Sequence, residues 1–91
     1  MERSAAETLA LKALVFLAGE DEALVRFLAL SGLAPQQLRQ RAGDPLLLAA
    51  VLDFVLGDDK LLFTFAQSEA VDPKLVHDAR RALPGGVAPE M

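Results

Sequence analysis

The chain has 91 residues, enough for one hydrophobic core but not for two separate domains. It contains no cysteine, which excludes disulfides, thiolate zinc sites and thiol nucleophiles, and its net charge of −4 argues against broad non-specific binding to nucleic acid. Hydrophobic residues make up 53 % of this small chain, so we expect part of its apolar surface to be buried against another chain.

The longest apolar run, residues 46–52, is far shorter than the ~20 residues that a membrane-spanning helix needs. The N-terminus lacks the basic stretch and apolar core of a secretory signal. These two observations predict a cytoplasmic protein.

The first predicted helix covers residues 5–18. Ser4 and Glu7 have the spacing of a capping box, and apolar residues follow at three- and four-residue steps. Gly19 is expected to end the helix in a left-handed conformation.

Two shorter helices are predicted next. Acidic residues at 20–22 favour the positive end of a second helix, which ends at Ser31-Gly32. Pro35 fits the first turn of a third helix, which ends before Gly43.

Asp44-Pro45 is the clearest helix start in the chain, because a capping carboxylate precedes the residue best tolerated in the first turn. The fourth helix runs from there to Leu56 and is apolar on nearly every face, so we expect it at the centre of the fold. On this basis we expect Phe54→Ala to cost about 3 to 5 kcal/mol.

Two further helices complete the prediction. Asp58 and Asp59 start the fifth helix after Gly57, and Asp72-Pro73 start the sixth. No strand alternation occurs, so we expect an all-α bundle of five to six short helices over residues 1–84, followed by a flexible tail over residues 85–91.

The second half of the chain resembles the first after a shift of 38 positions. Six identities follow this shift, from Phe16, Gly19, Asp21, Leu24, Phe27 and Pro35 to Phe54, Gly57, Asp59, Leu62, Phe65 and Pro73. The pattern predicts two similar three-helix units. Two explanations stay open, a true duplication and the shared start and stop residues of any short helical hairpins.

Asp53 is the only charge inside the apolar fourth helix, and a buried carboxylate requires a cation, water or amide donors. Arg39 and Arg41 are the nearest cations along the chain. We therefore predict a structural ion pair between Asp53 and one of these arginines, with a polar element in a binding groove as the second interpretation.

Residues with catalytic or metal-binding potential do not form a recognisable motif. His77 is the only histidine and has no accompanying nucleophile, and the acidic clusters at 20–22 and 58–59 lack the ligand spacing of a calcium loop. We expect no enzyme activity, no cofactor and no metal.

The segment from Phe27 to Arg39 has the rhythm of a helix-turn-helix, with Gly32 in the turn. The helices after Pro35 and Pro73 would then contact DNA. The candidate contacts are Gln36, Gln37, Arg39, Gln40, Arg41, Lys74, His77, Arg80 and Arg81.

Two segments resemble a known family, the Arg-x-Arg-Ala-Gly at residues 39–43 and the Val-Leu-Asp-Phe at residues 51–54. Together with the Pro and Leu residues around them, they are similar to a bacterial family of small helical proteins catalogued as a domain of unknown function. The resemblance covers nearly the whole chain. It implies a helical fold and assigns no activity or site residues.

Taken together, these features predict a non-enzymatic interaction module that uses apolar helix faces to form a homodimer or to bind another protein. The alternative is a small helix-turn-helix regulator, which requires the basic side chains to gather on one face. A third interpretation is a carrier that holds a small apolar ligand between its helices.

Overall fold

The computed structural model describes residues 1–85, and these residues form helices and turns without strands. The helices are α1 (Arg3–Ala18), α2 (Asp21–Ser31), α3 (Pro35–Gln40), α4 (Pro45–Leu56), α5 (Asp59–Glu69) and α6 (Pro73–Arg81). The all-α fold predicted from the sequence is therefore confirmed. Of the predicted tail, residues 85–91, all but Gly85 lies outside the described residues.

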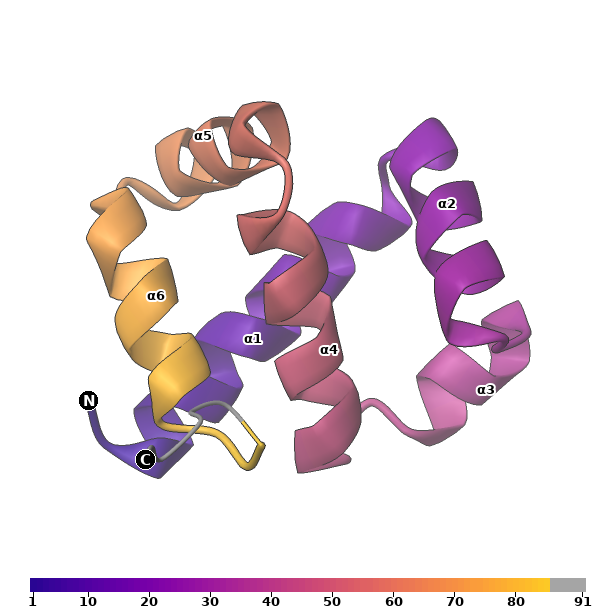
Figure 1. Ribbon diagram of the computed structural model, residues 1–91, viewed down its shortest axis with the longest axis horizontal. Coiled ribbons are helices and arrows are strands. Elements are labelled where there is room, and N and C mark those ends of the chain that lie inside the picture. Colours follow the sequence, from indigo (N-terminus) through magenta and orange to yellow (C-terminus); the bar gives the residue numbers. More distant parts are fainter. Residues whose placement is uncertain (86–91) are drawn as a thin grey trace.

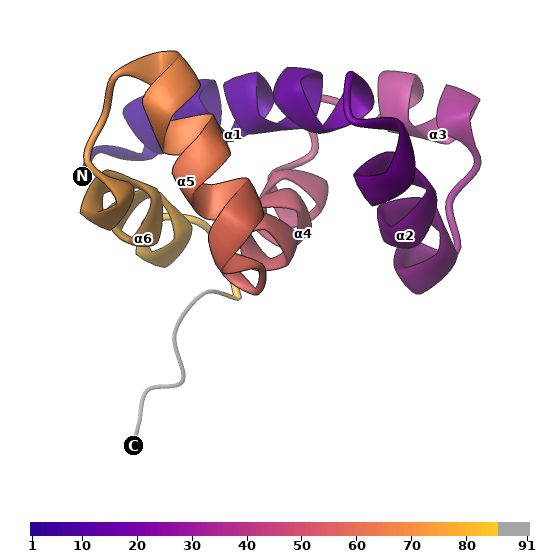
Figure 2. The same ribbon diagram turned by 90° about the horizontal axis from the view of Figure 1, so that it is seen from above.

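Helices α1 and α4 cross at the centre of the molecule (Figure 1). The α5–α6 hairpin lies on one side of this crossing, and α2 and α3 lie on the other, as the view from above also shows (Figure 2). Helix α6 packs against α1, α4 and α5, whereas α2 packs mainly against α1. Helix α3 makes no extensive contact with another helix of the described part of the chain. We call α2 and α3 together the arm.

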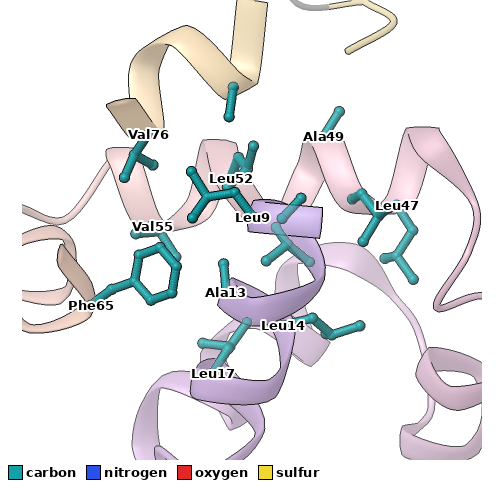
Figure 3. Close-up of a cluster of buried hydrophobic side chains, with 14 of the residues drawn as sticks. Leu9, Ala13, Leu14, Leu17, Leu47, Ala49, Leu52, Val55, Phe65 and Val76 are labelled. Carbon is teal, nitrogen blue, oxygen red and sulfur yellow. The ribbon is translucent and has the colours of Figure 1, made fainter. Parts of the chain in front are cut away.

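The core lies where α1, α4, α5 and α6 meet (Figure 3). Its fully buried side chains come from all four helices, and the largest are Leu17, Val51, Leu52, Val55, Phe65 and Val76. Each contributes roughly 1.5 to 3 kcal/mol when it leaves water. The arm adds only Ala23, Phe27 and Leu38 to the buried set.

Aspartates cap three of the helices, as the sequence predicts. The side chains of Asp44, Asp58 and Asp72 each accept a hydrogen bond from a backbone amide two residues further on, at 2.9 to 3.0 Å. These bonds satisfy amides that have no partner within the helix.

The start of α1 differs from the prediction. The helix begins at Arg3, so Ser4 and Glu7 both lie inside it instead of forming a capping box. The Ser4 hydroxyl donates to the carboxylate of Glu2 at 3.0 Å, and Glu7 pairs with Arg3 at 3.3 Å. The expected capping box is therefore wrong, because the helix starts earlier than that motif would place it.

The left-handed residues also lie elsewhere than expected. Gly19 has a φ of −90° and Gly57 a φ of −80°, so neither ends its helix in the left-handed region. Among the described residues a positive φ occurs at Gly32 (74°), Ala70 (56°) and Gly85 (71°). An alanine in this conformation carries strain that a glycine does not.

Several structural features follow the shift of 38 positions. Helices end at residues 18 and 56 and at 31 and 69, and helices start at 21 and 59 and at 35 and 73. The ring of Phe16 packs on Phe65, and that of Phe27 packs on Phe54, each with centroids 5.4 Å apart. Each contact joins one half of the chain to the other. An origin by duplication stays a prediction.

Candidate functional site

Asp53 pairs with Arg80 and not with Arg39 or Arg41. The Nε atom of Arg80 donates to Asp53 Oδ1 at 2.6 Å, which ties α6 to α4. Arg80 also donates to the carbonyl oxygens of Pro84 and Gly85, and only 12 % of its side chain is exposed. The predicted partners are wrong because α6 packs against α4 whereas α3 does not.

The Asp53 carboxylate is also less enclosed than its apolar sequence surroundings indicate. Its side chain is 59 % exposed, because α4 turns one face to solvent. Leu46 and Ala50 lie exposed on the same helix. The pair therefore links two helices at the surface and does not place a charge in the core.

The basic residues proposed for DNA contact do not form one face. Arg39 lies on α3 and Arg41 directly follows that helix, whereas Lys74, Arg80 and Arg81 belong to α6, at the opposite end of the molecule (Figure 1). Arg80 pairs with Asp53, and Arg81 pairs with Asp78, so acidic neighbours reduce their positive field. Binding to the phosphate backbone requires a continuous basic surface, which this arrangement does not provide.

Helix α3 is also poorly suited to reading DNA. Its six residues span only about 9 Å, less than two turns. The side chain of Gln37 accepts a hydrogen bond from the amide of Ala34 at 2.8 Å, so this glutamine caps the helix. Gln36 and Gln40 are exposed.

The remaining polar candidates are His77 and the acidic residues. His77 is exposed on α6, and among residues 1–85 no three His, Cys, Asp or Glu side chains are close enough to hold a metal ion. Asp58 accepts from the backbone amide of Leu61 and pairs with Arg26 at 3.2 Å. These bonds, that from Leu61 first, hold the pKa of Asp58 below its ordinary value, because they stabilise the charged form.

The most distinctive surface of the described residues is apolar and lies on α1. Val15 is 68 % exposed and Leu11 is 43 % exposed, although both belong to a helix whose opposite side forms the core. The two residues are one turn apart, so their side chains lie next to each other along the helix. We call Leu11 and Val15 the α1 ridge.

An apolar groove runs along the arm side of the α1 ridge. It has a volume of about 400 Å³, and the ridge forms one of its edges. Arg39 is the only charged residue that lines it. We call it the α3 groove; its other lining residues are Leu14, Ala18, Leu24, Pro35, Leu38 and Ala42.

A second hollow lies on the other side of the α1 ridge, toward the end of α5. It has a volume of about 380 Å³ and is lined by the ridge, Lys12, Phe16, Ser68 and Glu69. Lys12 and Glu69 form a long ion pair at 3.6 Å across it. We call it the α5 hollow. The α1 ridge therefore stands between two depressions.

The positions shifted by 38 explain why the α3 groove is open. Ala18 lines the groove, whereas its counterpart Leu56 packs against the core. Val15 and Ala42 also border the groove, and their counterparts are the ion-paired Asp53 and Arg80. At these positions the second half of the chain carries the larger Leu56 and the salt bridge between Asp53 and Arg80. The first half carries Ala18, Ala42 and the exposed Val15.

Sequence reasoning did not single out Leu11 and Val15. It assigned the inner face of the first helix to Leu9, Ala13 and Phe16 with Leu17, and these residues are buried or packed against the core. The signal for the ridge was nevertheless available, because Leu11 and Val15 are large apolar residues outside that inner-face spacing.

None of the helices in the described part of the chain has the length and apolar character needed to cross a lipid bilayer. No curated protein and no solved structure matches the chain. A family model described as a protein of unknown function, DUF3572, matches residues 3–86. The Arg-x-Arg-Ala-Gly and Val-Leu-Asp-Phe segments already implied a family of unknown function, and the family model covers nearly all of the sequence. The chain therefore belongs to the DUF3572 family.

Proposed function

We propose that the protein is a non-enzymatic interaction module that binds a folded protein chain through the α1 ridge and the α3 groove. The observation that carries this proposal is the exposure of the ridge between the apolar α3 groove and the α5 hollow. Exposed apolar patches on a small protein mark contact sites, because burying them in a complex removes their unfavourable contact with water.

The shape of this surface favours a protein over a small ligand. A pocket for a small molecule typically encloses about 70 to 90 % of its ligand. Here Val15 lines the groove and its side chain is itself 68 % exposed, so a small molecule within the groove would leave much of Val15 in contact with water. A partner helix or ridge would cover Val15 and fill the groove together.

Other exposed apolar residues form less extensive surfaces. Val25 on α2, Leu46 on α4 and Phe63 on α5 are 60 to 66 % exposed, but none of them lines either depression. Leu30 borders a smaller hollow of about 300 Å³ between α2 and α4, and Asp53 lies in that hollow's wall. The α1 ridge is therefore the stronger candidate for contact.

Site-specific photo-crosslinking in the native cell tests the proposal. A photoreactive amino acid at position 15 should crosslink to a protein, whereas the same amino acid at position 25 should not. Position 25 is a matched control, because Val25 is 66 % exposed and Val15 is 68 % exposed. Equal crosslinking at the two positions, or none at position 15, would contradict the proposal. The interaction is expected in the cytoplasm, the compartment that the sequence predicts.

A further inference from the structure

We propose that the occupant of the α3 groove is the α1 ridge of a second copy of this chain, and that the two copies form a symmetric dimer with their α1 helices side by side and parallel. This inference rests on the proposed function and names the partner. Two independent observations carry it, the shape of the surface and the position of its charges.

The shape is self-complementary. The α1 ridge is adjacent to an open groove of about 400 Å³ on the same face. In a two-fold dimer each contact occurs twice, so a ridge beside a groove allows two copies to exchange ridges. If the two-fold axis runs parallel to α1, between the ridge and the groove, the ridge of each copy lies in the groove of the other. An axis perpendicular to α1 within the interface would set ridge against ridge.

The charges favour the same arrangement. Arg39 lies at the arm side of the ridge, and Glu69 lies at the α5 side, where Lys12 of the same chain pairs with it at the long distance of 3.6 Å. Within the described residues, no acidic side chain forms an ion pair with Arg39. A two-fold axis parallel to α1 brings the arm side of one copy to the α5 side of the other, so that Arg39 approaches the partner copy's Glu69 and competes there with the long contact from Lys12. The perpendicular axis would place like charges together.

The groove can be filled to test the shape argument. Ala18→Leu introduces the side chain that the counterpart position, Leu56, already carries. The variant should raise the dimer dissociation constant at least about tenfold without lowering the stability of the monomer, because a leucine in the groove occupies the space of the incoming ridge. Sedimentation equilibrium measures the first effect and urea unfolding below the dissociation constant measures the second. An unchanged dissociation constant would overturn the proposal.

A charge exchange tests the orientation. Arg39→Glu and Glu69→Arg should each weaken the dimer at least about tenfold, because each places like charges opposite one another at two symmetric positions. The double variant should recover most of the wild-type affinity. Arg41→Glu is the matched control and should have little effect, since Arg41 lies two residues beyond Arg39, just after α3, and does not line the groove.

Two results would overturn the inference while leaving the proposed function in place. One is a wild-type protein that stays monomeric at several hundred micromolar although position 15 crosslinks to a different protein. The other is a dimer that Val15→Asp dissociates but that the double charge variant fails to restore. If a photoreactive amino acid at position 15 crosslinks to no protein at all, neither to a second copy nor to another protein, the proposed function itself is contradicted.

Discussion

Replacement of Phe65 by alanine tests where the core of this protein lies. Phe65 is fully buried, whereas Phe63, on the same helix, is 60 % exposed and Phe54, on α4, is partly buried. Removing a fully buried phenylalanine costs about 3 to 5 kcal/mol, because apolar contacts are lost and a cavity remains. A chain of 91 residues is expected to have a free energy of unfolding of about 5 to 14 kcal/mol. Phe65→Ala therefore removes a large share of the stability.

Urea unfolding followed by circular dichroism measures this loss. With an m-value of about 1.5 kcal/mol/M, Phe65→Ala should lower the midpoint by about 2 to 3 M. Phe63→Ala should change the free energy of unfolding by no more than about 0.5 kcal/mol. Phe54→Ala should fall between them, at about 1 to 3 kcal/mol, because its ring is only partly removed from water. This value revises the larger cost expected from the sequence. Equal midpoints for Phe63→Ala and Phe65→Ala would refute the assignment of the core.

Three further predictions concern the backbone and the charges. Both Gly32 and Ala70 have a positive φ, which glycine adopts more readily than alanine. Urea unfolding should therefore show that Ala70→Gly stabilises the fold and that Gly32→Ala destabilises it, each by about 0.5 to 1 kcal/mol. Effects of the same sign would contradict this prediction. Arg80→Ala should lower the free energy of unfolding by about 1 to 2 kcal/mol, more than Asp53→Asn does, because the arginine also binds two carbonyl oxygens. A larger loss for Asp53→Asn in the same assay would contradict this prediction. The pKa of Asp58 is lowered in the folded state, so its contribution is present above the ordinary aspartate pKa and lost as the pH falls through the lower folded value. Urea midpoints between pH 6 and pH 2.5 should therefore fall less steeply for Asp58→Asn than for wild type, and identical slopes would argue against the ion pair and cap.

Local sequence signals were sufficient to locate the helices. Pro35, Pro45 and Pro73 are each the first residue of a helix, because proline tolerates the first turn and disrupts the interior. Asp44 and Asp58 form the expected caps, because a short carboxylate reaches the amides of its own first turn. These interactions lie within a few residues of the chain and do not depend on how the helices pack.

The same local reasoning was wrong where a residue had alternative neighbours. Ser4 and Glu7 have the spacing of a capping box, yet Glu2 and Arg3 offer closer partners once the helix starts earlier. Gly19 was expected in the left-handed region, but the turn between α1 and α2 keeps it right-handed. A helix boundary is set jointly by the local motif and by the position of the next helix.

The sequence by itself determined the all-α class, the order of the helices, most of their ends and the side of α1 that is buried, because the periodicity and the caps act over one or two turns. Only the tertiary structure decided that Asp53 binds Arg80, that the basic residues lie at opposite ends and that Leu11 and Val15 stand between two depressions. Those features depend on which helices pack together. Helix α6 is held against α1 and α4 by its buried side chains, whereas the short α3 is not, and this difference in non-local packing leaves the groove open.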